Sequence, residues 1–161
     1  MSNNQFMRFF YFASFNAILG SIWTFLILIP DLSISRIIAL GSAGTWFFVG
    51  YITFLVVGCA GIFSCGVAHF MFLSIKNKIP NTKITWLGLI VWEIGLIGST
   101  CLLGLSGFIG GSGLLDGLSI GEIHESIVIY ALPIEILVGI TILGFLISII
   151  NLYMAKQQQI K

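Results

Sequence analysis

Two carboxylates, Glu93 and Glu135, are the residues most able to do chemistry, because both fall inside long apolar runs. Glu93 interrupts the run ITWLGLIVWEIGLIGSTCLLGLSGFI at residues 84–109, and Glu135 follows Pro133 early in another. Inside a membrane, each carboxyl is expected to hold its proton at neutral pH, because burial away from water disfavours the charged form. The pair is therefore a candidate for passing protons or binding a cation. The alternative is a neutral acid bonded to Asn16, to a Ser or Thr, or to a carbonyl that Pro133 frees.

His69 and Cys65 form a second candidate site, since positions four apart share one face of a helix. Together with Glu93, which we expect at a similar depth, they could supply three ligands to a metal ion. A haem with His69 as its axial ligand is the other option. The alternative is a buried histidine hydrogen-bonded to Glu93 or to a backbone carbonyl. We favour that alternative because no HxxH, HxxxH or CxxC spacing accompanies the pair.

A third cluster lies between the last two apolar segments. Its members are Asp116, Glu122, His124 and Glu125. Oxygen and imidazole groups this close in sequence can hold a divalent cation. The ordinary alternative is helix capping, because negative side chains are stabilised at a helix N-terminus. We favour capping, since Glu122 and Glu125 fall at the expected start of the last segment.

Composition restricts the class of protein more firmly than these candidates do. Hydrophobic residues make up 58% of the chain and charged residues 8%, whereas soluble domains carry about 25% charged residues. An all-α integral membrane protein is therefore expected, in contact with the lipid bilayer. The net charge of +1 and the lack of a basic cluster argue against nucleic acid as a partner. No catalytic or phosphate-binding motif is present, so a role as an enzyme is not favoured and no cofactor is strongly implied.

The apolar runs predict a single transmembrane domain, a bundle of four helices. Their expected ranges are 9–29, 45–74, 84–109 and 126–154. The second apolar segment, at about residues 37–75, is too long for one crossing, so we expect residues 41–44 to bend it or to precede the spanning part. The glycine-rich stretch from residue 110 to 125 is the longest connection in the chain, and GFIGGSG, residues 107–113 where the third helix passes into it, predicts a flexible connection.

Basic residues predict the orientation of this bundle. Arg8, Lys76, Lys78 and Lys83, with Lys156 and Lys161, fall on one side if there are four crossings. The other side has Arg36 as its one basic residue, together with Asp31 and the acidic residues of the third cluster. The positive-inside rule then places both termini in the cytoplasm, and we expect the cell membrane as the location.

Small residues on two of the predicted helices indicate close helix packing. Gly58 and Gly61 share a face, as do Gly95 and Gly98. The faces serve packing within the bundle or form a groove for a partner helix or a lipid-like ligand.

Three functional hypotheses follow from the sequence. The leading one is a non-catalytic accessory or assembly subunit of a larger membrane complex, with energy-transducing complexes such as those of the respiratory chain as the expected class. The first alternative is a proton-coupled carrier that acts as an oligomer through Glu93 and Glu135. The second is an electron-transfer subunit that binds haem or quinone. Partners would be other membrane subunits or further copies of the chain.

Overall fold

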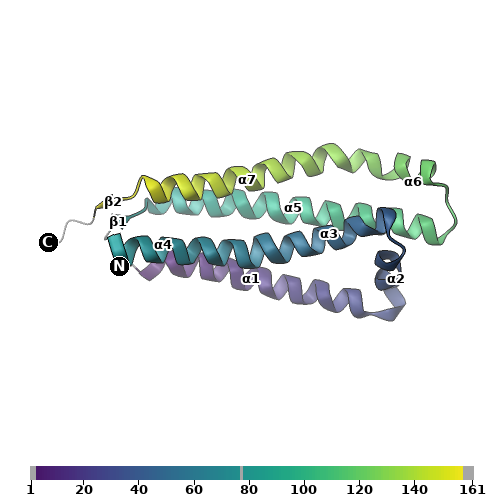
Figure 1. The fold of residues 1–161 in the computed structure, drawn as a ribbon, viewed down its shortest axis with the longest axis horizontal. Coiled ribbons are helices and arrows are strands. Elements are labelled where there is room, and N and C mark those ends of the chain that lie inside the picture. The colour runs from purple at the N-terminus through teal and green to yellow at the C-terminus, as the bar shows by residue number, and fades with distance from the viewer. Residues whose placement is uncertain (1–2, 77, 158–161) are drawn as a thin grey trace.

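The computed structural model describes residues 3–76 and 78–157, which form four long helical rods lying side by side (Figure 1). Each rod contains a helix long and apolar enough to cross a membrane. Lys161, one of the basic residues used to predict the orientation, lies outside the described residues. The rods are α1 (Asn3–Leu28); α3 (Thr45–Thr53), η3 (Phe54–Gly61) and α4 (Ile62–Lys76); α5 (Thr82–Leu115); and α6 (Ile120–Ile127), η4 (Val128–Tyr130) and α7 (Ala131–Tyr153).

A compact turn joins the first two rods at one end of the bundle. It consists of η1 (Pro30–Leu32), α2 (Ile34–Ala39) and η2 (Ser42–Gly44). Gly41 adopts φ 71° and ψ −152°, a backbone conformation that side-chain-bearing residues rarely adopt. The bend predicted at residues 41–44 is confirmed, and both Gly41 and Ser42, at φ 71° and 49°, adopt positive φ there.

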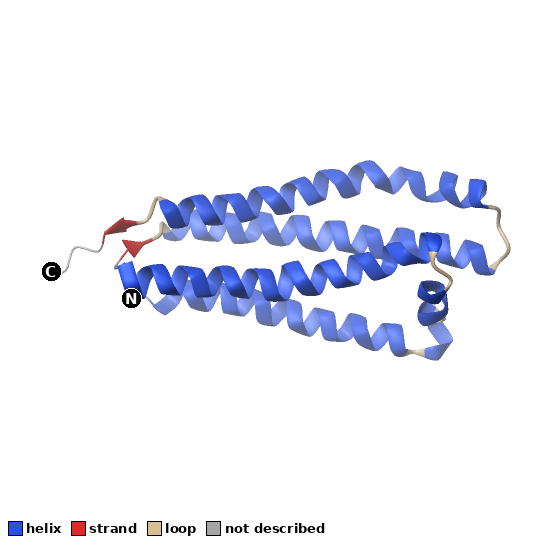
Figure 2. Ribbon diagram, in the orientation of Figure 1, coloured by secondary structure: helices blue, strands red, loops and turns tan. Residues whose placement is uncertain are grey.

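A two-stranded sheet closes the opposite end (Figure 2). Strand β1 (Lys78–Ile79) pairs antiparallel with β2 (Lys156–Gln157), so that Lys78 lies opposite Gln157. The sheet ties the connection between α4 and α5 to the end of α7. The described chain thus begins and ends at the same end of the bundle, the end where the basic residues of the α4–α5 connection lie.

The prediction of a flexible connection directly after residue 107 is wrong, because α5 continues to Leu115. Gly110 and Gly111 are buried in its last turns. A Cβ on Gly110 would lie 2.5 Å from Ala43 Cβ, so the bare backbone lets the end turn pack directly on α5. Glycine disfavours helix locally by about 1 kcal/mol, and here the tertiary packing outweighs that preference.

The fourth rod also begins earlier than predicted, at Ile120 instead of residue 126. It is interrupted at η4, a 3₁₀ turn that ends just before Pro133. Proline lacks an N–H donor and its ring clashes with the carbonyl four residues earlier, which here belongs to Ile129. Pro133 therefore divides this rod into α6 and α7.

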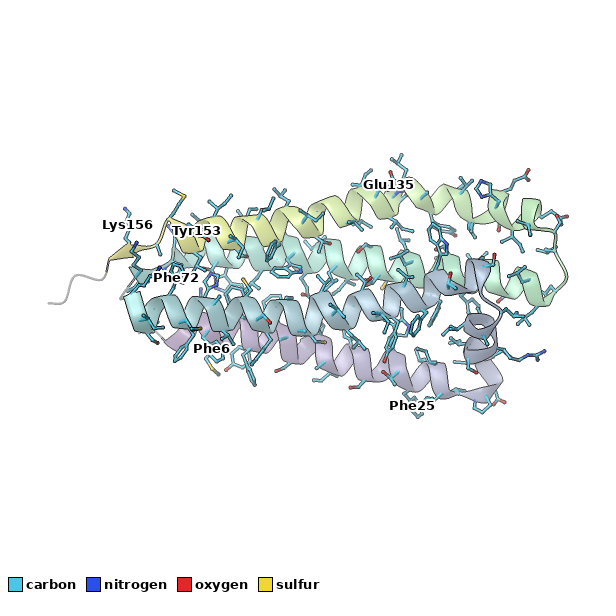
Figure 3. The ribbon with its side chains drawn as sticks, viewed as in Figure 1. Phe6, Phe25, Phe72, Glu135, Tyr153 and Lys156 are labelled. Atoms are coloured by element: carbon cyan, nitrogen blue, oxygen red, sulfur yellow. The ribbon has the colours of Figure 1, made fainter. Side chains whose placement is uncertain are left out.

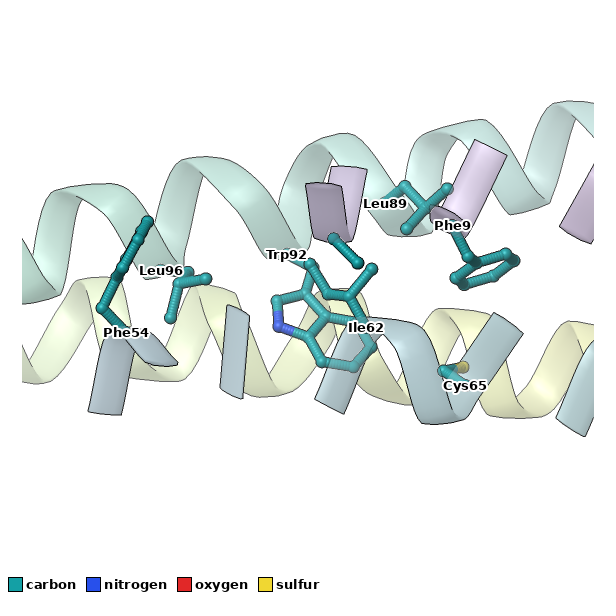
Figure 4. Packing of buried hydrophobic residues seen from close by; sticks show 8 residues of the cluster. Phe9, Phe54, Ile62, Cys65, Leu89, Trp92 and Leu96 are labelled. Carbon is teal, nitrogen blue, oxygen red and sulfur yellow. The ribbon is translucent and has the colours of Figure 1, made fainter. Parts of the chain in front are cut away.

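Helix α5 is the centre of the bundle. Its contact with α7 is nearly backbone to backbone, since a Cβ on Gly95 would lie 2.7 Å from Leu137 O and one on Gly88 would lie 3.2 Å from Gly144 O. The Gly95–Gly98 face therefore serves packing within the bundle. Between α5, α1 and the second rod lies the apolar core, whose residues include Phe9, Phe54, Ile62, Leu89, Trp92 and Leu96 (Figure 4).

Candidate intramembrane polar site

Glu93 lies in the interior of the bundle. Helices α1 and α5 run in the same direction, and this places Asn16 of α1 against Glu93 of α5. Asn16 is fully buried and Glu93 is 8% exposed. The prediction that Glu93 faces protein is therefore confirmed, and so is Asn16 as its hydrogen-bond partner.

One amide group holds this site together. Asn16 Nδ2 donates to Glu93 Oε2 at 3.1 Å and to the carbonyl oxygen of Gly58 at 3.2 Å. Both hydrogens of the amide are thereby used. Glu93 Oε1 and Asn16 Oδ1 are buried, and neither has a hydrogen-bond partner among the described residues. The site therefore has two acceptors left over and no donor for them.

The Gly58 carbonyl comes from an unusual backbone. Residues Phe54–Gly61 form a π-helix, in which hydrogen bonds span one residue more than in an α-helix. Such segments occur frequently at functional sites. Gly58 also lets Asn16 approach, because a Cβ there would lie 3.1 Å from Asn16 Nδ2.

A second buried polar cluster, near the sheet end, makes a useful comparison. Asn151 Nδ2 donates to Asn81 O at 3.0 Å and to Thr85 Oγ1 at 2.9 Å, and Asn151 Oδ1 accepts from Asn81 N at 2.9 Å. All polar atoms of the Asn151 side chain are paired, as is usual for a structural network. Our sequence analysis missed this cluster, although a lone Asn at the end of an apolar run was a usable signal.

His69 does not lie at the depth of Glu93, contrary to our expectation. Its ring packs against Phe9 at 4.5 Å between centroids, whereas Glu93 lies beside Asn16. Phe9 and Asn16 are about 10 Å apart along α1 at a rise of about 1.5 Å per residue. His69 Nδ1 is 2.9 Å from the carbonyl oxygen of Cys65, which confirms the predicted bond to a backbone carbonyl. His69 Nε2 is buried without a partner among the described residues.

The candidate metal site of Cys65, His69 and Glu93, which the sequence did not favour, is not assembled. Cys65 Sγ lies 3.8 Å from His69 Nδ1, but the described residues contain no group of three His, Cys, Asp or Glu side chains that could hold a metal ion. The separation of Glu93 from His69 along the bundle is the physical reason.

Glu135 is on the outside of the bundle. Its side chain is exposed on α7 and points away from the other helices (Figure 3). Leu132 and Ile136 beside it are 65% and 55% exposed. Leu137 packs on Gly98 of α5, so Glu135 lies close to the middle of the bundle's length. The structure therefore does not bring Glu93 and Glu135 of one chain together.

Within the third cluster, Glu122 caps a helix, as predicted, whereas Glu125 does not lie in its first turn. Ser119 N and Ser119 Oγ both donate to Glu122 Oε2, at 2.8 and 2.7 Å, and Glu122 N donates back to Ser119 Oγ at 3.4 Å. This capping box starts α6. The S-x-x-E spacing was a signal for Ser119 that our sequence analysis missed. Asp116 caps the end of α5, and His124 and Glu125 are exposed. The alternative of a cation site is not assembled in the part of the chain that the structure describes.

An apolar groove of about 600 Å³ runs between α7 and the second rod. Trp92 and Leu96 of α5 are among its lining residues, and Phe145 of α7 meets the Trp92 ring edge to face at 5.3 Å. Trp92 is 2% exposed, and its Nε1 donor has no acceptor among the described residues. A second apolar groove of about 440 Å³ lies beside Trp23, Phe47 and Thr100.

Comparison with models of protein families, with curated proteins and with solved structures finds no match to this chain.

Proposed function

We propose that this protein is a non-catalytic subunit of a larger membrane complex, and that a transmembrane helix of another subunit covers the groove between α7 and the second rod. The observation that carries the proposal is the position of Glu135, an ionisable residue exposed on the outer surface of a membrane-spanning helix near the middle of the bundle. Such residues almost always face protein or a water-filled cavity. A partner at this surface would cover the Glu135 carboxyl.

The groove lies on the same face of α7 as Glu135. Val138, Ile142 and Phe145 line the groove, and they follow Glu135 at helical spacings of three, seven and ten residues. A helix placed along this wall would therefore reach the carboxyl as well. We expect the partner helix to carry a hydrogen-bond donor or a basic side chain opposite Glu135.

The facing wall has the composition of a helix-packing surface. Gly61, Ser64 and Ala68 line the groove and recur at i, i+3 and i+7, so they share one face of the second rod. Small residues let helix backbones approach closely in a membrane. The comparable face of α5, at Gly95 and Gly98, is already covered by α7.

The dimensions of the groove suit a helix that lies over it. The lining residues extend from Thr53 to Ala68, which is about 22 Å of helix and much of a hydrocarbon core about 30 Å thick. A whole helix, about 10 Å across, is too wide to enter a groove of this volume. Its side chains can enter, and one of them can offer an acceptor to Trp92 Nε1.

Orientation and location belong to the same proposal. The basic residues of the α4–α5 connection support placing the sheet end of the bundle in the cytoplasm, by the positive-inside rule, with the cell membrane as the compartment. The partner helix would then cross the same membrane beside α7.

Native mass spectrometry of the protein, extracted gently from its own membrane, tests the proposal. We expect a particle that contains at least one other membrane protein. Ala68→Phe, which fills the groove, should release that partner. Ala60→Phe is the matched control, because Ala60 lies in the same rod, is exposed and does not line the groove. A free monomer, a homo-oligomer or a particle with only lipid in the groove would contradict the proposal.

A proton-coupled carrier is the second candidate, and the buried Glu93 favours it. Because Glu135 lies on the outer surface, such a carrier would use Glu93 without Glu135 of the same chain. Retention of transport in Glu93→Gln would rule it out.

A further inference from the structure

We infer that Glu93 is a reversible proton-binding site, in which Asn16 is the positioning residue and the ligand is a proton exchanged with the surroundings. The inference rests on the atoms around Glu93 and is independent of what covers the groove beside α7.

One added proton would give a hydrogen-bond partner to every polar side-chain atom of the site. The amide hydrogens of Asn16 are used by Glu93 Oε2 and Gly58 O, so the two unpartnered atoms, Glu93 Oε1 and Asn16 Oδ1, are both acceptors. A proton on Oε1 turns that oxygen into a donor. A small rotation of either side chain then lets it bond to Asn16 Oδ1, which gives a cyclic acid–amide pair with every polar atom partnered.

The orientation of the Asn16 amide is set by its surroundings. With its oxygen and nitrogen exchanged, Asn16 would place its carbonyl oxygen against the carbonyl oxygen of Gly58, and two acceptors would face each other. The arrangement with Nδ2 toward Gly58 avoids this contact. The free Oδ1 atom is therefore a property of the site.

Burial makes the deprotonated state of Glu93 costly. Without the added proton, Glu93 is a carboxylate with one hydrogen bond in an apolar core, next to Leu96 and Trp92. A buried charge of this kind is costly unless it is paired or solvated. Loss of the proton should therefore loosen the contact between α1 and the π-helix, so that water reaches the carboxylate.

The groups packed around the site supply no compensating positive charge. From η3, the half-buried Cys59 is within electrostatic range of Glu93. From α4, Cys65 and His69 lie nearer the sheet end, and from α7, Glu135 is on the outer surface. From α1, Arg8 is at the sheet end, where it donates to Thr82 O at 3.4 Å. Among the described residues, no cationic side chain is hydrogen-bonded to Glu93.

A proton fits this site better than a metal cation does. Oxygen-bound metal ions take several ligands, six to eight for Ca²⁺, whereas two oxygens are free here. Asn16 Nδ2, a donor, also points at the carboxylate and would repel a cation placed there.

Infrared difference spectroscopy of the full chain in lipid nanodiscs, recorded across a pH titration, tests the inference. Every protonated carboxyl contributes a C=O band, so the band of interest is the component that wild type shows and Glu93→Gln lacks, and this component should disappear at high pH and return on reacidification. Glu93→Gln should lose this band, because its amide does not ionise but can still accept from Asn16. Glu135→Gln is the matched control and should keep the band.

Two further measurements test the role of Asn16 and distinguish a proton site from a metal-cation site. Asn16→Leu should keep the band and shift it to higher frequency, because the carbonyl loses a hydrogen bond. If that variant does not fold, Asn16→Ser provides the same comparison. Loss of the band on adding NaCl but not choline chloride at constant pH would identify a metal-cation site and overturn the inference. Identical carboxyl bands in wild type and Glu93→Gln, or a Glu93 component that never titrates while the helix content is constant, would also overturn it.

Discussion

Gly144 of α7 provides the sharpest test of the close α5–α7 packing. An alanine Cβ at this position would lie 2.5 Å from Trp92 Cα and 2.8 Å from Gly88 O. Non-bonded carbon atoms prefer separations of about 3.5–4.0 Å. The obstructing atoms belong to the backbone and cannot rotate away, so the two helices must separate by about 1 Å.

The cost of Gly144→Ala can be estimated from this geometry. Overpacking a well-packed contact costs about 1–3 kcal/mol. Gly139 is the matched control, because it lies in the same helix and no described atom beyond its local backbone lies within 4 Å of its added Cβ. There, alanine gains helix propensity of up to about 1 kcal/mol. The same propensity gain applies at residue 144 and cancels between the two variants, so we expect Gly144→Ala to be less stable than Gly139→Ala by the overpacking cost alone, about 1–3 kcal/mol.

Reversible unfolding in mixed micelles, with increasing SDS and detection by circular dichroism, measures this difference. Both variants differ from wild type by one methyl group, so a general effect of alanine in α7 would appear in both. If Gly144→Ala unfolds at the same SDS fraction as Gly139→Ala or a higher one, the backbone contact between α5 and α7 is not as the structure describes it.

Two further substitutions test other parts of the fold by the same unfolding assay. Gly41→Ala should destabilise the bundle by about 1–3 kcal/mol through backbone strain, because φ at this position is 71°. No described atom lies within 4 Å of the added Cβ, so a steric clash does not contribute. Stability equal to wild type would show that the turn does not require glycine. Asn151→Leu should lower the free energy of unfolding by about 2 kcal/mol, because Asn81 and Thr85 lose buried hydrogen-bond partners. It should also raise the hydrogen-exchange rate of the Asn81 backbone amide. An unchanged exchange rate there would contradict the hydrogen-bond network.

The candidate site shows where reasoning from sequence stops. The sequence identified Glu93 as a costly group that must face protein, and it named Asn16 among the possible partners. It treated Glu93 and Glu135 alike, because both are lone carboxylates in apolar runs. The face that each presents depends on how the helices are rotated about their axes, and all-apolar helices have no polar stripe to reveal that rotation.

Apolar composition and run length alone determined the class of this protein. Four runs of this length and hydropathy form four helices able to cross a membrane, since a helix lets each segment satisfy its backbone polar groups within itself. The tertiary structure decided what these helices contact. It extended α5 through glycines that favour a loop locally, buried Glu93 against Asn16 and a π-helix, and left Glu135 outside. The local sequence determines which segments form apolar helices, whereas contacts between segments distant in sequence determine which side chains are buried and hydrogen-bonded.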